Sequence, residues 1–253
     1  MFAPFAFMGG AAAAIVQPDE ISGLVSWYDF SDSGTITESG GRLSAITDKS
    51  TSNITMTSAV NDPYYSSTGG PNSTAYIYTN DGAADYYLQA ASNYPGPTNE
   101  KLQTVFFIGY FGTLSYDSVV HTTKFPAATP IFLKDSTSSP DDGVFSLKDG
   151  GGSPPYGSSF NSNQGTGTSN WVYAIGIGDS GTNYTSEAYY SSAWNAGASR
   201  AYGSVTGYTP LRFLRGNSFR STGGVSEFFG YDRVLTSTEI DDMKAYIEDK
   251  YGL

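Results

Sequence analysis

The stretch "FFGYDRVLTSTEIDDMKAYIEDKYGL" (residues 228–253) decides the fold, because a strand ends and a helix begins within it. Thr236 is followed three positions later by Glu239, the spacing of a capping box. In that motif the hydroxyl accepts a hydrogen bond from a first-turn amide, and the carboxylate accepts one from the amide of the cap residue. Gly252 is suited to the C-terminal cap. The sequence therefore predicts a helix over about 236–251.

This helix carries one apolar stripe. Ile240, Met243, Ile247 and Tyr251 recur at three- and four-residue spacing, with acidic residues elsewhere around the helix. A helix this short is marginal in water without tertiary contacts. We therefore expect the stripe to pack on a sheet whose last strand spans 225–231.

The rest of the chain has the composition of short strands joined by turns. Among 253 residues there are 30 Gly, 20 Tyr and 15 Phe, and only 15% are charged. Turn clusters recur too often to leave room for crossover helices, so the sequence predicts a single all-β domain, an antiparallel β-sandwich, over residues 21–253. Alternation predicts strands at 23–30, 74–79, 103–111, 143–148, 171–178, 211–215 and 225–231.

Three local expectations follow from the same patterns. In 23–30, alternation places Leu24 and Tyr28 on one face and Trp27 on the other. In 171–178, the bulky face that begins with Trp171 and Tyr173 is expected to meet the core. The polar stretch 149–170 is expected to be a long loop.

Charge and cysteine content exclude several classes of partner. The chain has 24 acidic and 13 basic residues, a formal net charge of −11, which repels nucleic acid and anionic membranes. It has no cysteine, so it has neither disulfides nor thiolate metal sites. We expect neither nucleic acid nor a membrane as partner.

Residues 1–16, "MFAPFAFMGGAAAAIV", are almost wholly apolar. The first basic residue is Arg42, so the cationic leader of a signal peptide is missing, and the run is shorter than the roughly 20 residues that span a bilayer. We expect residues 1–20 to form an arm that docks in a groove of a neighbouring subunit; packing on the chain's own domain, or a frayed end, is the alternative. The arm's apolar contacts would come from Phe2, Phe5, Phe7, Met8, Ile15 and Val16.

Several motifs together resemble a known family. They are "GLVSWYDFSDSGTIT", "GGRLSAITDKS", "DPYY", "NDGAADYYL" and the closing stretch quoted above. They resemble the concanavalin A-like, laminin-G-like jelly-roll domains of bacteriophage virion proteins and bacterial surface proteins. The resemblance covers about residues 21–253, and is strongest at both ends. It implies that the first and last strands pair and that the terminal helix closes the domain.

Catalytic signals are missing. The single histidine, His121, has no partner pattern, and neither a G-x-S-x-G nucleophile elbow nor the E-x-D-x-x-E strand motif of glucanases is present. We expect no enzyme activity and no cofactor, with a degenerate glycoside hydrolase as the enzymatic alternative. Asp141, Asp142 and Asp149 offer loop oxygens of the kind that calcium prefers, but Asp is also an ordinary turn former, and we expect turns here rather than a calcium site.

Carbohydrate binding has some support. Sugar sites combine aromatic rings with polar groups, and Tyr189, Tyr190, Trp194 and Asn195 supply both in a loop-prone segment. The tyrosine pairs are further candidates. The alternative is that one ring of each pair faces the core and the other only covers the sheet. These pairs are Tyr64 with Tyr65 and Tyr86 with Tyr87.

Two functions of different classes follow. The first is a structural virion surface protein, a capsid decoration or tail-associated protein that is present in multiple copies or as a homo-oligomer and contacts other virion subunits through its arm. The second is an adhesin module that binds host-surface glycan. The expected location is the virion surface, or alternatively the outside of a bacterial cell.

Overall fold

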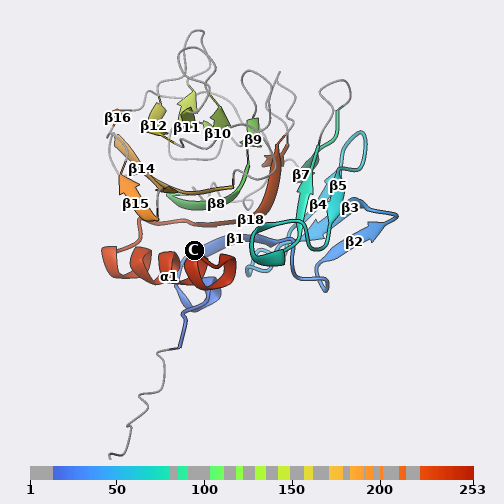
Figure 1. Ribbon diagram of the computed structural model, residues 1–253, viewed down its shortest axis with the longest axis horizontal. Helices are drawn as coiled ribbons and strands as arrows, with labels where there is room; N and C mark the ends of the chain where they lie inside the picture. Colours follow the sequence, from blue (N-terminus) through green and yellow to red (C-terminus); the bar gives the residue numbers. More distant parts are fainter. Residues whose placement is uncertain are drawn as a thin grey trace, which may run out of the picture.

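The computed structural model describes residues 14–79, 85–90, 103–110, 118–121, 129–134, 142–148, 157–161, 171–178, 183–190, 192–196, 200–201, 211–214 and 223–253. For residues 118–121, 129–134, 142–148, 157–161, 183–184, 190 and 200–201 it describes the backbone alone. The described part is strands, with one α-helix at its C-terminal end (Figure 1).

The strands are short. The first nine are β1 (Leu24–Asp29), β2 (Ile36–Ser39), β3 (Arg42–Thr47), β4 (Thr55–Ser58), β5 (Tyr64–Ser66), β6 (Tyr76–Tyr78), β7 (Leu88–Ala90), β8 (Thr104–Tyr110) and β9 (Ser118–His121). The others are β10 (Thr129–Lys134), β11 (Asp142–Lys148), β12 (Gly157–Asn161), β13 (Val172–Gly178), β14 (Asn183–Tyr190), β15 (Ala193–Ala196), β16 (Arg200–Ala201), β17 (Arg212–Phe213) and β18 (Gly224–Tyr231). The helices are η1 (Pro18–Glu20), η2 (Pro71–Ser73) and α1 (Ser237–Tyr251).

The strands form two layers, and each pairing between named strands is antiparallel. One layer runs β1–β18–β8–β13–β14–β15, with β6 beside the first residues of β18. The other runs β2–β3–β4–β7–β17–β9–β10–β11–β12. The β5–β6 hairpin joins the layers, because β5 also pairs with β3. The predicted antiparallel sandwich is confirmed, and so is the pairing of the first predicted strand with the last.

Aromatic side chains fill the space between the layers. Phe213 of β17 packs edge-on against Tyr28, Phe30 and Phe228 of the opposite layer, with ring centroids 5.5, 5.9 and 5.5 Å apart. Leu43 of β3 is fully buried in the same cluster. This core therefore joins strands from both ends of the chain.

Helix α1 lies on the outer face of the β1–β18–β8–β13 layer (Figure 1). The amide of Thr236 donates to Glu239 Oε2 (2.9 Å) and Thr236 Oγ1 accepts from the amide of Glu239 (3.3 Å), so both halves of the capping box are present. The helix ends at Gly252, whose φ of 70° is the left-handed conformation that favours glycine. The predicted helix and its stripe are confirmed, because these side chains are buried: Ile240, Met243, Tyr246, Ile247 and Tyr251.

The bulky face of β13 meets a hydrophobic core, as expected, but this is the core under α1 rather than the one between the two layers. Tyr173 and Ile175 of β13 pack under α1, whereas Val172 and Ala174 face the core between the layers. Large side chains fit there because the space between α1 and the sheet is a second apolar core. Large rings from other strands already fill the core between the two layers. In β1, a bulge between Leu24 and Ser26 breaks the alternation, so Leu24 lies on the face of Trp27 rather than that of Tyr28.

The polar stretch 149–170 is not wholly a loop. β12 (Gly157–Asn161) lies inside it and pairs with β11. Polar strands that lack alternation give no periodic signal, so this strand was not predicted.

The chain enters the domain through η1. Ile21 is 6% exposed in the cluster under α1, Val16 packs against that cluster, and Tyr231 donates its hydroxyl proton to the carbonyl of Pro18 (3.0 Å). Ile15 is 37% exposed, and Phe2, Phe5, Phe7 and Met8 lie outside the described residues. The C-terminal part of the predicted arm therefore packs on its own domain. No helix in the described ranges is long and apolar enough to cross a membrane.

Candidate functional site

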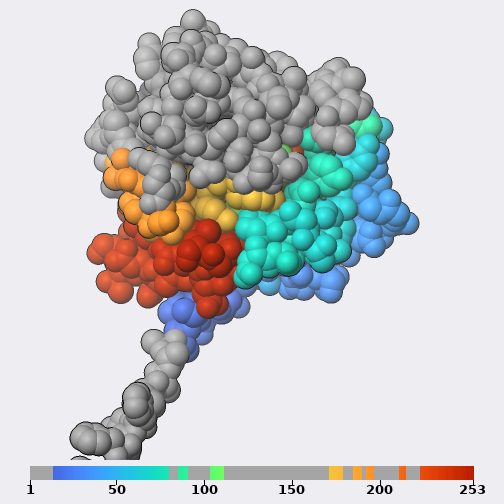
Figure 2. Space-filling model, in the orientation of Figure 1, coloured from blue at the N-terminus to red at the C-terminus, as the bar shows by residue number. Residues whose placement is uncertain are grey.

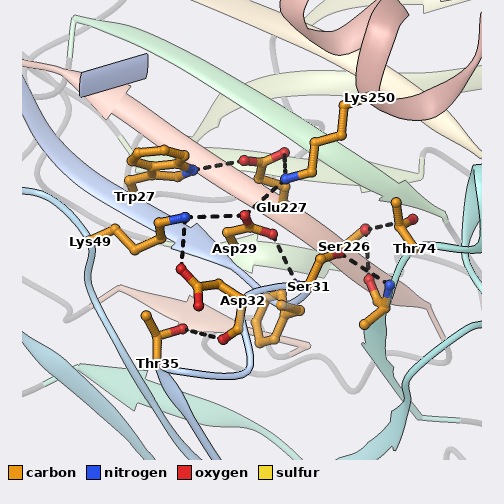
Figure 3. A network of polar contacts seen from close by, with 12 residues as sticks. Trp27, Asp29, Ser31, Asp32, Thr35, Lys49, Thr74, Ser226, Glu227 and Lys250 are labelled. Atoms are coloured by element: carbon orange, nitrogen blue, oxygen red, sulfur yellow. Dashed lines mark hydrogen bonds and ion pairs between the residues drawn. The ribbon is translucent and has the colours of Figure 1, made fainter. Parts of the chain in front are cut away.

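A buried carboxylate, Glu227 of β18, lies beneath the end of α1 (Figure 3). Its side chain is fully buried and accepts four hydrogen bonds. Oε1 accepts from Trp27 Nε1 (2.7 Å) and the Tyr246 hydroxyl (2.8 Å). Oε2 accepts from Lys250 Nζ (3.0 Å) and the Tyr251 hydroxyl (2.8 Å). Three of these donors come from the helix and one from the first strand.

The network extends outward through alternating charges. Lys250 Nζ lies 3.0 Å from Asp29 Oδ2, Lys49 Nζ lies 3.4 Å from the same oxygen, and Lys49 Nζ also lies 2.9 Å from Asp32 Oδ2 (Figure 3). Burial by itself would lower the pKa of Lys250, but the carboxylates of Glu227 and Asp29 outweigh it and raise that pKa. The hydrogen bond from Lys49 lowers the pKa of Asp32.

This arrangement anchors the helix. Each oxygen of Glu227 already accepts two hydrogen bonds, and the side chain is not accessible from solvent. A catalytic carboxylate needs a free lone pair directed at a reacting group. Glu227 is therefore a structural residue that joins β1, β18 and α1.

The predicted sugar-binding segment forms a β-hairpin rather than a loop. Tyr189 of β14 lies opposite Trp194 of β15, with ring centroids 5.6 Å apart. The indole of Trp194 donates to Glu248 Oε1 of α1 (2.8 Å), and Lys244 Nζ lies 5.6 Å from its ring centroid. Asn195 donates to the carbonyl of Ala193 (2.7 Å). The structure thus brings Tyr189 and Trp194 together, half-buried against the helix, and the side chain of Tyr190 lies outside the described set.

A second aromatic group lies on the outer surface of the sandwich, where the β5–β6 hairpin joins the two layers near the C-terminal end of α1. Pairing places Arg42 opposite Tyr64, Tyr64 opposite Tyr78, and Gly224 opposite both Tyr78 and Tyr110, so these residues form one line across β3, β5, β6, β18 and β8. Their sequence neighbours Leu43, Ile77 and Val225 point into the core between the layers. The line therefore lies on the outer surface.

The rings in this line are in contact with one another. Tyr64 stacks on Tyr78 with centroids 5.2 Å apart, and Tyr78 lies 5.1 Å from Tyr76. Tyr76 and Tyr110 both meet Trp171 edge-on at 5.2 Å. At the other end, Tyr86 lies 5.8 Å from Tyr64. We call this group the tyrosine row: Arg42, Tyr64, Tyr76, Tyr78, Tyr86, Tyr110 and Trp171.

Gly224 makes the row possible. A Cβ at this position would collide with the ring of Tyr110 and would lie 2.9 Å from the carbonyl oxygen of Ile77. The absence of a side chain lets the Tyr110 ring lie across β18 toward Tyr76, whose centroid is 6.0 Å away. Glycine in a strand often marks such a close approach.

The row is partly open to solvent. Arg42, Tyr64, Tyr78, Tyr86 and Trp171 are half-buried. Tyr76 and Tyr110 are only 8% and 2% exposed, and burial raises the pKa of both phenols. The row therefore presents ring edges and neutral hydroxyls, which both donate and accept hydrogen bonds.

Arg42 ends the row. Its guanidinium carbon lies 3.4 Å from the centroid of Tyr64 and 5.1 Å from that of Tyr86, and its Nη1 donates to the carbonyl of Asp62 (2.9 Å). The tyrosine pairs divide as the structural alternative expected, because Tyr65 packs against the core and Tyr87 is buried. The outward members, Tyr64 and Tyr86, meet beneath Arg42.

The predicted histidine and calcium candidates belong to neither aromatic group. His121 ends β9, Asp142 begins β11, the side chains of both are outside the described set, and Asp141 and Asp149 lie outside the described residues altogether. Within the described ranges, no group of three His, Asp or Glu side chains could hold a metal ion. Sequence reasoning missed Arg42, although its place at the start of an alternating strand, "RLSAIT", is a usable signal for an outward side chain.

The fold is similar to several solved structures. The binding domain of Paraclostridial Mosquitocidal Protein 1 matches with a TM-score of 0.55 at 14% identity, over 87% of this chain and 51% of that chain. The binding domain of Botulinum Neurotoxin DC in complex with SialylT matches with a TM-score of 0.50 at 10% identity, over 88% and 51%. Trypanosoma rangeli sialidase in complex with the inhibitor DANA matches with a TM-score of 0.51 at 12% identity, over 91% and 33%.

These similarities concern the fold. The chain spans about half the length of the two toxin binding domains and a third of the sialidase. No protein-family model and no curated protein matches the sequence.

Proposed function

We propose that this chain is a non-enzymatic carbohydrate-binding module whose binding surface is the tyrosine row. The main support is a row of half-buried rings on an outer face that α1 does not cover. These rings are Tyr64, Tyr78 and Tyr86, which line up with Arg42. Aromatic rings pack against the apolar C–H groups of a sugar, and phenol hydroxyls exchange hydrogen bonds with its hydroxyls. The glycan is on a cell surface.

The location of the row suits a surface module. Figure 2 shows the C-terminal helix (red) beside the segment that carries η2 and β6 (turquoise), and Asn72 Nδ2 of η2 donates to the carbonyl of Lys250 (3.0 Å). The row thus begins where the helix ends, on an anchored part of the domain. The similarity to a toxin binding domain solved with SialylT supports the same proposal at the level of the fold.

The test compares the loss of two hydroxyls from the tyrosine row with the loss of one hydroxyl from the β14–β15 hairpin. In the variant Tyr64→Phe with Tyr78→Phe, the rings remain and two exposed-side hydroxyls are lost. Tyr189→Phe makes the same change in the β14–β15 hairpin and serves as the matched control. Retention on a panel of immobilised bacterial and animal glycans is expected to weaken about tenfold for the row variant and to stay unchanged for the control.

Two results would contradict the proposal. If the hairpin variant loses retention and the row variant does not, the binding site is the segment with Tyr189 and Trp194. If the unmodified chain is retained on no glycan, the chain is not a carbohydrate-binding module.

A second candidate function is assembly into a particle surface, such as a phage virion, through the apolar N-terminal arm. The observation that favours it is that Ile15 is 37% exposed while Val16 packs on the domain, so an apolar side chain at the end of the predicted arm is left at the surface. A chain from which residues 1–14 are deleted keeps Ile15 and Val16. We expect an unchanged melting temperature and loss of multimers in light scattering; an unchanged mass would exclude the arm.

A further inference from the structure

Arg42 differs from four of the other five cations whose side chains are described; the fifth, Arg212, donates its Nε proton to Gln89 Oε1 (2.8 Å). Lys49, Arg233, Lys244 and Lys250 all pair with carboxylates. In the described part of the chain, no carboxylate forms an ion pair with Arg42, although the chain has 24 acidic residues. A cation without a carboxylate partner in the described part of so acidic a chain is available for an anion from outside.

Neighbouring residues restrict the guanidinium of Arg42 to one position. The guanidinium carbon lies 3.4 Å from the ring centroid of Tyr64 and 5.1 Å from that of Tyr86, and Nη1 donates a hydrogen bond to the carbonyl of Asp62. The edge formed by Nε and Nη2 has no acceptor among the described residues. Two parallel N–H groups on such an edge match the two oxygens of a carboxylate. Because aromatic contacts already restrict the side chain, less conformational entropy is lost when the anion binds.

We infer that the tyrosine row selects a saccharide that carries a carboxylate, and that Arg42 is the residue that recognises it. This inference rests on the proposed carbohydrate-binding function and adds its ligand class. The net charge of −11 repels a dense polyanion, so the expected ligand carries isolated acidic sugars among neutral ones. A uronic acid and a sialic acid share this chemistry.

The experiment uses matched acidic and neutral probes on the full chain. A disaccharide of one uronic acid and one neutral sugar is compared with its methyl ester, and sialyllactose with its methyl ester, by isothermal titration at low and moderate salt. We expect at least one acidic probe to bind about tenfold more tightly than its neutral partner, with a smaller ratio at higher salt. The pair of probes that shows the preference distinguishes a uronic acid from a sialic acid.

Two variants test the residue. Arg42→Gln should remove the difference in affinity between the acidic probe and its neutral partner, and Arg42→Lys should keep part of that difference because the charge remains. Circular dichroism of both variants checks folding. Equal binding of acidic and neutral probes, or a preference that survives in Arg42→Gln, overturns the inference and leaves the carbohydrate-binding function standing. Binding of no probe and no panel glycan overturns both.

Discussion

Replacing Glu227 with Gln removes a charge from the centre of the helix anchor while keeping the shape of the side chain. Four donors lie 2.7–3.0 Å from the two carboxylate oxygens. Trp27 and Lys250 can only donate, so an amide nitrogen cannot replace the oxygen that it displaces. The substitution leaves at least one buried donor without an acceptor.

The magnitude follows from these contacts. Removing one partner of a buried ion pair costs about 3–5 kcal/mol. Lys250 keeps Asp29 at 3.0 Å, and the tyrosine hydroxyls can rotate, so the expected loss lies at the lower end. We expect Glu227→Gln to lower the free energy of unfolding by about 3 kcal/mol.

Urea unfolding followed by tryptophan fluorescence measures this loss. A double-mutant cycle with Lys250→Met isolates the pair, and its coupling energy is expected to be about 1–3 kcal/mol. A loss below about 0.5 kcal/mol, the range of ordinary surface substitutions, or additive single losses, would refute the reasoning that Glu227 anchors the helix.

Three further predictions concern the fold. Thr236→Ala removes the hydroxyl that caps α1 and should cost about 1 kcal/mol in urea unfolding. The hydrogen bond from Arg233 lowers the pKa of Glu239 to about 2; since this is below the unfolded value of about 4.5, its stabilisation is complete above pH 4.5 and is lost as pH falls toward 2. Glu239→Gln should therefore flatten the fall of the melting temperature over that range, and an unchanged slope would count against it. Gly224→Ala drives a methyl group into the Tyr110 ring and should cost about 1–3 kcal/mol, whereas a neutral effect would show that the ring is free to move.

The terminal helix could be predicted from the sequence because its signals are local. The cap, the stop and the apolar stripe all lie within residues 236–252, and each agrees with the structure. The pairing of the first and last strands followed from a family resemblance instead. The position of the bulky face of β13 could not be predicted, because alternation identifies two faces but does not say which layer each will meet.

The tyrosine row could be predicted only in part. The doublets at 64–65 and 86–87 indicated one outward ring each, but not that the outward rings would meet. That meeting depends on the register of β3, β5, β6, β18 and β8, which are distant in sequence. The contacts of Glu227 could not be predicted for the same reason: it is the one acid in the sequence 225–231, and its donors come from β1 and α1.

The most direct test of the proposed function is a nuclear magnetic resonance titration of the isotope-labelled chain with a retained oligosaccharide. If the tyrosine row binds sugar, the resonances of Arg42, Tyr64, Tyr78 and Tyr86 shift and saturate together, while those of Trp194 and Asn195 stay in place. Saturable shifts confined to Trp194 and Asn195, or no saturable shifts at all, would contradict the account.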